Sequence, residues 1–161
     1  MKIKFFTTGG TIDKVYFDAK SEFEVGSPQV LEVIKEAHVV FEHEIESILR
    51  KDSLDMTEAD RQLIRHRVEA EACPFIVVTH GTDTMVQTAQ ALLDIPQKTI
   101  VLTGSMQPAR FRITDAVFNI GSAIGAVQSL PPGVYIVMNG RVFDPRKTRK
   151  NVQKNCFEEV A

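Results

Sequence analysis

Short apolar runs rich in β-branched residues alternate along the chain with segments in which apolar side chains recur at helical spacing. Continuous apolar runs of this kind are typical of strands that are buried on both faces of a sheet. The predicted strands are residues 3–7, 38–45, 75–79, 99–103 and 134–139. The predicted helices are residues 28–37, 57–72, 83–93 and 114–129.

Two of the predicted helices begin with recognisable caps. Ser27 precedes Pro28, and proline is favoured at the first helical position. Thr57 is followed by Glu58 and Asp60, whose negative charges favour the positive end of a helix dipole. Because strand and helix alternate throughout, the pattern predicts a three-layer, doubly wound α/β fold with a mainly parallel sheet. The simplest arrangement is a single domain with the flavodoxin-like strand order 2-1-3-4-5.

Hydroxyl and glycine residues are concentrated just after the predicted strands. In an open parallel sheet, ligands bind beyond the carboxyl ends of the strands, where the strand order reverses. That position lies between the first and third strands, which run into TTGGTIDK and THGTDTM. The loops after the second and fourth strands carry KDSLDMT and TGSMQP. We therefore expect four polar loops to meet around a small ligand.

The loop chemistry leaves several interpretations open. TTGGT matches neither GxGxxG nor GxxxxGK[ST], so no nucleotide motif is present, and a glycine pair is more often turn geometry than a site. Thr82 and Asp83, with a lysine from the basic tail, would supply the parts of a proton relay. Equally, Thr82 would cap the following helix and Asp83 would favour its dipole. His80 is expected at the polar rim, and Phe111 and Phe118 on the core face of the fourth helix.

Composition narrows the class of protein. The 161 residues are 43% hydrophobic and 25% charged, with a formal net charge of −2. This balance is average for a globular domain and gives no reason to expect nucleic acid or a membrane as partner. No signal-peptide core is apparent, and no apolar run approaches the roughly 20 residues of a membrane helix. Cys73 and Cys156 belong to no metal motif, which fits a reducing cytoplasm, with a single disulfide as the alternative.

Several motifs together resemble the bacterial-type L-asparaginase family. The three most specific are TGGTI at residues 8–12, THGTDTM at residues 79–85 and TGSMQP at residues 103–108, in this order. Two further matches are DS..M, formed by Asp52, Ser53 and Met56, and VMNG at residues 137–140. The resemblance covers essentially the whole chain. It implies one asparaginase N-terminal-type domain over residues 1–161 and an amidohydrolase that releases ammonia from a small side-chain amide such as L-asparagine.

The resemblance also implies roles for individual residues. Thr11 matches the family's nucleophilic threonine on a mobile loop, and Thr82 matches a second threonine that acts with Asp83 and a lysine. Lys150 takes the lysine position when VMNGRVFDPRKTRK is aligned without a gap. The residues implied for substrate binding are Gly10, Asp52, Ser53, Gly81 and Ser105. Among these, the serine at 53 would bind the substrate's α-carboxylate, and the two glycines would let backbone N–H groups approach the ligand and the oxyanion. Asp83 would add a contact to the α-amino group.

The resemblance implies no metal and no organic cofactor. Besides a small amide, the expected partner is a second copy of the chain, in a homo-oligomer whose interface lies near the site. The expected location is the cytoplasm.

Three departures from the family pattern bear on activity. Family members are usually longer, with a C-terminal domain that helps to close a neighbouring subunit's active site, so this chain is expected to represent the N-terminal domain. Aligning SEFEVG, residues 21–26, on the mobile loop puts Phe23 where the family has a tyrosine that activates the first threonine. Tyr16 is the nearby substitute, and it completes the catalytic set. Leu54 stands where a polar substrate contact often lies.

These departures keep alternative functions open. One is a short amidohydrolase of asparaginase type. Another is a catalytically weak or inactive relative that binds a small amino acid or amide. A third is a chain that needs a separately encoded second subunit.

Overall fold

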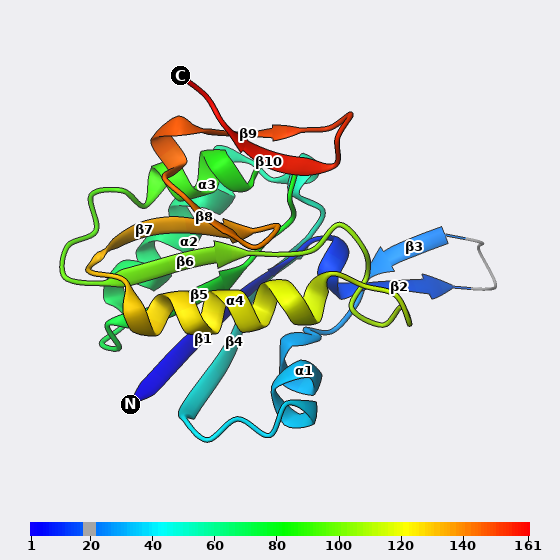
Figure 1. Cartoon of the computed structure of the whole chain (residues 1–161), viewed down its shortest axis with the longest axis horizontal. Helices are drawn as coiled ribbons and strands as arrows, with labels where there is room; N and C mark the ends of the chain where they lie inside the picture. The colour runs from blue at the N-terminus through cyan, green and yellow to red at the C-terminus, as the bar shows by residue number, and fades with distance from the viewer. Residues whose placement is uncertain (18–21) are drawn as a thin grey trace.

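The computed structural model describes residues 1–17 and 22–161 (Figure 1). Within this part, the main sheet has six strands in the order β4-β1-β5-β6-β7-β8. The first five are parallel to their neighbours, and β8 is antiparallel to β7. The strands are β1 (Lys2–Gly9), β4 (Glu42–Lys51), β5 (Phe75–Thr79), β6 (Thr99–Thr103), β7 (Gly133–Met138) and β8 (Arg141–Phe143).

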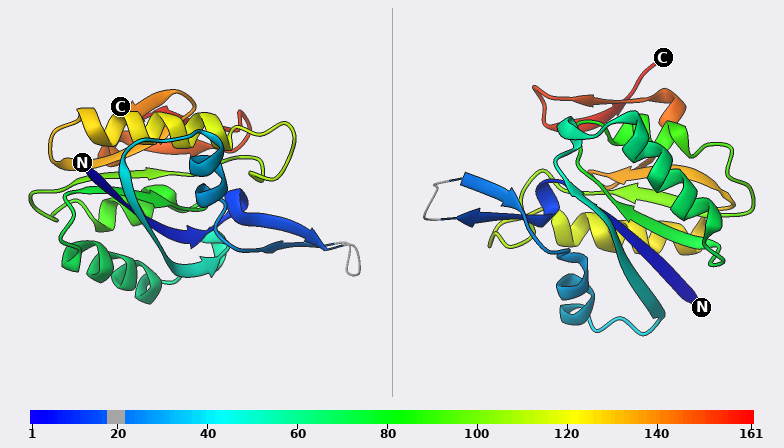
Figure 2. Two further views of the ribbon diagram at one scale, coloured as in Figure 1. Left: turned by 90° about the horizontal axis from the view of Figure 1, so that it is seen from below. Right: turned by 180° about the vertical axis from the view of Figure 1, so that it is seen from behind.

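Helices cover both faces of this sheet. They are α1 (Val30–Glu36), α2 (Glu58–Ala70), α3 (Met85–Ala91) and α4 (Ala116–Ser129). Residues of α2 and α3 belong to the core on one face, and residues of α1 and α4 belong to the core on the other. The left view of Figure 2 shows α4 and α2 on opposite sides of the strands. The predicted three-layer α/β fold with a mainly parallel sheet is confirmed.

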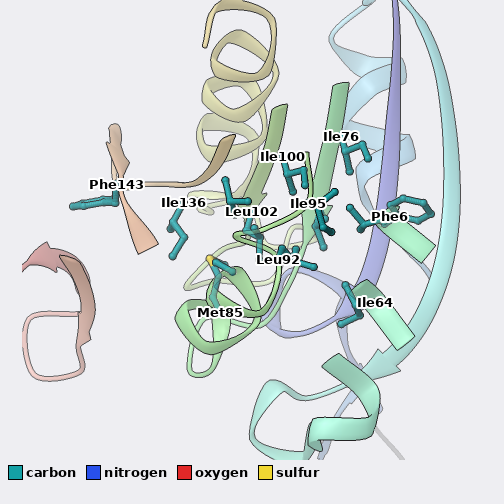
Figure 3. Close-up of a cluster of buried hydrophobic side chains, with 14 of the residues drawn as sticks. Phe6, Ile64, Ile76, Met85, Leu92, Ile95, Ile100, Leu102, Ile136 and Phe143 are labelled. Atoms are coloured by element: carbon teal, nitrogen blue, oxygen red, sulfur yellow. The ribbon is translucent and has the colours of Figure 1, made fainter. Parts of the chain in front are cut away.

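Neighbouring residues of the central strands point to opposite faces of the sheet. Phe6 and Ile76 contribute to the core under α2 and α3, which Figure 3 shows from close by. Phe5 and Val77 contribute to the core under α1 and α4. Because both faces are buried, the strands are apolar at successive positions, which is the pattern that indicated a parallel sheet.

The two predicted caps have different outcomes. Thr57 caps α2 as expected: its Oγ1 accepts from the Asp60 N–H at 3.2 Å, and Asp60 Oδ2 accepts from the Thr57 N–H at 2.8 Å. The helix α1 begins at Val30 with Gln29 at the cap position, so the cap predicted at Ser27 is wrong.

The second predicted strand was placed too early in the chain. It begins at Glu42 rather than residue 38 and continues to Lys51. The apolar residues that suggested the earlier start lie in a loop that follows a turn at His38, which has a positive φ of 50°, and Val40 is fully exposed. The short apolar segment at residues 38–41 therefore has the composition of a strand but lies in the connection between α1 and β4.

Two small hairpins were not predicted, and both matter for the site. The first joins β2 (Lys14–Phe17) to β3 (Glu22–Val25) and projects from the body of the molecule (Figure 1). The second joins β9 (Thr148–Asn151) to β10 (Cys156–Glu159) and lies beside α3. Both cysteines are free thiols, so the disulfide alternative is wrong.

Two further observations concern apolar surface. Phe111 and Phe118 are exposed, so their predicted place in the core under the fourth helix is wrong. None of the helices in the described part of the chain is both long enough and apolar enough to cross a bilayer.

Candidate active site

The loops after β1, β4 and β5 lie in close contact with one another. A Cβ atom added to Gly10 would lie 2.5 Å from the Gly81 Cα, and one added to Gly81 would lie 2.6 Å from the Ser53 Oγ. Such distances are far below a van der Waals contact, so both positions require glycine. Gly10 also has a φ of +89°, which favours glycine over any residue with a side chain. Thr11 and Thr82 directly follow these two touching glycines, so the predicted convergence of their loops is present.

A lysine from the far end of the chain completes the cluster. Lys150 Nζ donates to Thr82 Oγ1 at 2.7 Å and to Asp83 Oδ1 at 2.6 Å. The lysine side chain is 13% exposed and that of Asp83 is 37% exposed, so the ion pair lies at the edge of the protein interior. Because the Thr82 oxygen accepts from the ammonium, its own proton is left for another acceptor.

The cap interpretation of Thr82 is wrong. The cap residue of α3 is Thr84, whose side chain makes no cap hydrogen bond. Its hydroxyl donates instead to the Ser53 carbonyl oxygen at 2.8 Å. The hydroxyl of Thr82 is thus free for the relay geometry that the sequence offered as the other interpretation.

The β9–β10 hairpin places Lys150 by anchoring itself in the core. Phe157, which is opposite Lys150 in the hairpin register, is buried and its ring lies 6.3 Å from that of Phe143. Its N–H donates to Asn139 Oδ1 at 2.9 Å. One strand of the hairpin is therefore fixed to the end of the sheet while the other presents the ammonium to Thr82.

Ser53 has the features of a ligand contact. It is only 1% exposed, and its hydroxyl has no hydrogen-bond partner among residues 1–17 and 22–161. A buried hydroxyl without a partner carries a free-energy cost that a bound acceptor would remove. The position next to Gly81 puts this hydroxyl in the same loop cluster as the threonines.

Asp52 is held by the protein itself. Its carboxylate accepts from Lys14 Nζ at 2.8 Å and from the Leu54 N–H at 3.1 Å. Burial raises the pKa of Asp52, but the hydrogen bonds from Lys14 and Leu54 outweigh that effect, and the net pKa is lowered. The carboxylate therefore links the β2–β3 hairpin to the loop that carries Ser53.

Two other residues implied for substrate binding are also engaged within the protein. The Gly10 N–H donates to the Lys51 carbonyl oxygen at 2.9 Å. Ser105 is buried, and its hydroxyl donates to the Gln107 carbonyl oxygen in its own loop. The glycine serves the close approach of the loops, and the serine stabilises the turn after β6.

Tyr16 and Phe23 face each other across the β2–β3 hairpin. They are register partners, and their ring centroids lie 5.3 Å apart. The Phe23 ring also lies 5.9 Å from that of Phe111. The rings of Tyr16 and Phe23 are both half exposed, and the Leu54 side chain is more exposed than either. Ser21, the first residue of the segment aligned with the family's mobile loop, lies outside the described residues.

His80 is a buried structural residue, so its predicted place at the rim is wrong. Its Nδ1 lies 2.7 Å from the Gly81 carbonyl oxygen, and its Nε2 lies 2.8 Å from Thr88 Oγ1. Burial lowers the pKa of His80 to about 4, so the ring is neutral at physiological pH. An Nδ1–H donor to Gly81 and an Nε2 acceptor from Thr88 satisfy both nitrogens. Thr88 is a contact that its spacing in the sequence did not suggest.

An open groove of about 350 Å³ borders the cluster on the α3 side. Its walls include Asp83, Lys150 and the side chains of Gln87 and Gln90. In the described residues, no group of three or more His, Cys, Asp or Glu side chains is placed to hold a metal ion.

Known proteins share both the sequence pattern and the fold. The glutaminase-asparaginase of Pseudomonas aeruginosa is 29% identical over 126 residues, which are 74% of this chain and 34% of that protein. The L-asparaginase of Thermococcus kodakarensis is 30% identical over 174 residues, covering 99% of this chain and 51% of that protein. The chain thus spans about half or less of these relatives' lengths.

Solved structures agree with these relatives. The structure of the thermostable L-asparaginase from Thermococcus kodakarensis matches with a TM-score of 0.88 at 28% identity over 99% of this chain and 51% of that one. A probable cytoplasmic L-asparaginase from Campylobacter jejuni matches with a TM-score of 0.82 at 26% identity, over 98% of this chain and 52% of that one. Residues 2–160 match the family model described as asparaginase, N-terminal. The motifs, the fold and the match over nearly all residues lead to one conclusion: the chain belongs to the asparaginase family.

Proposed function

We propose that the protein hydrolyses a small side-chain amide, L-asparagine or a related compound, to the acid and ammonia through a threonine nucleophile. The observation that carries the proposal is the contact of Lys150 Nζ with both Thr82 Oγ1 and Asp83 Oδ1, at 2.7 and 2.6 Å. An ammonium that is mostly buried against a hydroxyl and a carboxylate has the parts needed to move a proton.

Thr11 is the proposed nucleophile. Its hydroxyl oxygen attacks the amide carbon, and the collapse of the tetrahedral intermediate releases ammonia and leaves an ester on Thr11. Water then attacks the ester, which releases the acid and restores the hydroxyl. In the first half of the reaction one proton passes from the Thr82–Lys150 pair to the leaving nitrogen. The proton that Thr11 loses returns to this pair, so each step is balanced.

Thr82 and Lys150 are proposed to deliver the proton to the leaving nitrogen. The ammonium donates to the Thr82 oxygen, and the Thr82 hydroxyl proton is directed to the substrate. Asp83 forms an ion pair with the ammonium, and its side chain, which is more than a third exposed, is the proposed contact for a substrate amino group. The unpartnered hydroxyl of Ser53 is the proposed contact for the α-carboxylate.

The Gly81 backbone and the phenol of Tyr16 have supporting roles in this proposal. Gly81 N–H is the proposed donor to the developing oxyanion. Tyr16 is the proposed substitute for the hydroxyl that Phe23 lacks, since it occupies the position directly across the hairpin.

The setting of this activity is a cytoplasmic homo-oligomer. Two free thiols fit a reducing compartment. The groove beside Asp83 is open in one copy of the chain, and a second copy at this position would exclude water from the ion pair. Residues 1–161 act as one domain of asparaginase N-terminal type in this arrangement.

The experiment is an assay of ammonia release from asparagine, glutamine and simple amides. We expect the Thr82→Ala variant to lose release from the wild-type substrate by at least about 100-fold, which is the size of a general acid–base contribution. Its far-UV circular dichroism and melting temperature should match those of the wild type. Ser122→Ala is the matched control, because that hydroxyl bonds to the Phe118 carbonyl oxygen on the exposed face of α4. Wild-type turnover by Thr82→Ala would contradict the proposal.

The second candidate is a binding module for a small amino acid or amide. It is favoured by Phe23, which offers no hydroxyl at the position where the family pattern has tyrosine. Thermal shifts with asparagine or glutamine, without ammonia release from any amide, would support this function and exclude the hydrolase.

A further inference from the structure

The β2–β3 hairpin is attached to the rest of the molecule at a buried carboxylate. Asp13 ends the 3-10 turn that begins at Thr11, just before the hairpin enters β2. Its carbonyl oxygen accepts from the Gly26 N–H at 2.8 Å, where the hairpin leaves β3. Its Oδ1 accepts from the Gln29 N–H, also at 2.8 Å, where α1 begins. Asp13, which precedes the hairpin, is therefore hydrogen-bonded to two residues that follow it, Gly26 and Gln29.

This carboxylate is expensive to bury. Asp13 is 2% exposed, and burial raises its pKa to about 7, although the Gln29 N–H and the positive charge of Arg50 in β4 act in the opposite direction. Within the described part of the chain, no basic side chain lies at ion-pair distance from it. A neutral residue would fill the same space at a lower cost, so the acceptor at this position has a use beyond packing.

The loop after β6 is also hydrogen-bonded to the 3-10 turn and to Gln29. The Ala109 N–H donates to the Ile12 carbonyl oxygen at 3.0 Å. Arg110 Nε donates to Gln29 Oε1 at 3.1 Å, so the residue that binds Asp13 is itself held in place. The 3-10 turn that carries Thr11 thus lies between α1 and this loop. Ile12 of the turn packs in the core with α1, and the Asp13 side chain adds a hydrogen bond to Gln29, the residue before α1.

We propose that Asp13 is a positioning residue for Thr11: its carboxylate fixes the root of the β2–β3 hairpin and thereby keeps the Thr11 hydroxyl in one place relative to Thr82. The proposal rests on the proposed amide hydrolysis for its kinetic consequences. Its structural consequence, a hairpin root held by the Asp13 side chain, is independent of any reaction.

The test compares Asp13→Ala with Asp13→Asn. Alanine removes the acceptor, whereas asparagine keeps an oxygen at Oδ1 for the Gln29 N–H. We expect Asp13→Ala to lower kcat by about 10- to 100-fold with KM within about threefold, the pattern of a misplaced nucleophile. Asp13→Asn should retain kcat within about threefold at pH 6. Glu71→Ala is the control, because that carboxylate also accepts from a backbone N–H, that of Cys73, at 2.9 Å, just ahead of β5.

Two further measurements separate a positioning role from a structural one. Hydrogen exchange in residues 14–17 and 22–26 should be faster in Asp13→Ala, while exchange in β5 and β6 stays unchanged. Between pH 6 and pH 8, the ratio of wild-type kcat to that of Asp13→Asn should rise, because only the wild type gains a carboxylate acceptor there. The charged and polar groups that face this carboxylate, Arg50 and the Gln29 N–H with Arg110 behind it, are the same in both proteins.

The outcomes are distinct. Equal exchange and equal kcat in wild type and Asp13→Ala would overturn the proposal, as would faster exchange throughout the molecule with an unchanged kcat per folded molecule. If Asp13→Ala does not fold, a pH-independent ratio between wild type and Asp13→Asn would overturn it. If the wild type hydrolyses no amide, the proposed function fails, and hydrogen exchange alone decides the role of Asp13.

Discussion

Replacing Asp13 by asparagine should make the protein more stable at alkaline pH, because the folded protein buries this carboxylate at a cost. The carboxyl group has a pKa of about 7 when folded, against an ordinary value of 3.8. Between these two values the folded state binds a proton that the unfolded state has released. The contribution of Asp13 to stability is therefore complete at pH values below the unfolded pKa, and it is lost as the pH rises through 7.

The magnitude follows from the displacement of the pKa. A difference of roughly three units corresponds to about 4 kcal/mol between the two extremes of pH. Over the range from pH 5 to pH 8, in which most proteins can be studied, the expected change is about 2.5 kcal/mol. The asparagine variant has no such titration, so its advantage over the wild type should grow by about that amount across this range.

Urea unfolding of both proteins at pH 5, 6, 7 and 8 measures this difference directly. Other titrating groups are common to both proteins, so their effects cancel in the difference of the unfolding free energies. A difference that stays constant from pH 5 to pH 8, or one that favours the wild type as the pH rises, would refute the burial cost assigned to this carboxylate.

Three other predictions concern the site and its support. Lys150→Met should reduce ammonia release by at least about 100-fold, since it removes the proton donor to the proposed relay, whereas Lys154→Met, on the exposed turn of the same hairpin, should leave the rate within about twofold. Gly10→Ala should lower the unfolding free energy by about 3 kcal/mol in urea titrations, because the position combines positive φ with a backbone contact. Gly121→Ala, where nothing lies within 4 Å of the added Cβ, should instead raise it by about 0.5–1 kcal/mol, and equal effects of the two changes would refute the close approach of the loops. The His80 ring should remain neutral down to pH 5 in an NMR titration, because burial lowers its pKa to about 4. The stability that this residue contributes is lost only as the pH falls below the pKa of the unfolded state. A midpoint near 6.5 would show an exposed ring instead.

The fold could be predicted where burial imposes a pattern that survives in one sequence. The central strands are apolar on both faces, as Phe75–Thr79 and Thr99–Thr103 show, and the burial follows their positions closely. The β9–β10 hairpin gave no such signal, because TRKN and CFEE are short, charged and partly exposed. Its apolar anchor is the buried Phe157, whose partners Phe143 and Asn139 come from elsewhere in the chain.

The site was predictable to a similar extent. The convergence of the loops that carry Thr11 and Thr82 follows from the topology of a parallel sheet, and the lysine position came from a family resemblance rather than from spacing. His80 shows what could not be predicted. A histidine beside a glycine and three threonines suggests a solvent-exposed position at the edge of a site. Only the folded structure shows that the ring is buried, with Thr88 and the Gly81 carbonyl oxygen as the hydrogen-bond partners of its two nitrogens.

The position of the β9–β10 hairpin in the sequence also determines when, during synthesis, Lys150 can reach Thr82. The five parallel strands all precede the hairpin in the sequence. Lys150, which lies in the hairpin, comes 68 positions after Thr82, the residue that it contacts. Synthesis proceeds from the N-terminus, so the five parallel strands leave the ribosome before the hairpin does. The contact between Lys150 and Thr82 therefore cannot form until β9 has been synthesised and has left the ribosomal tunnel.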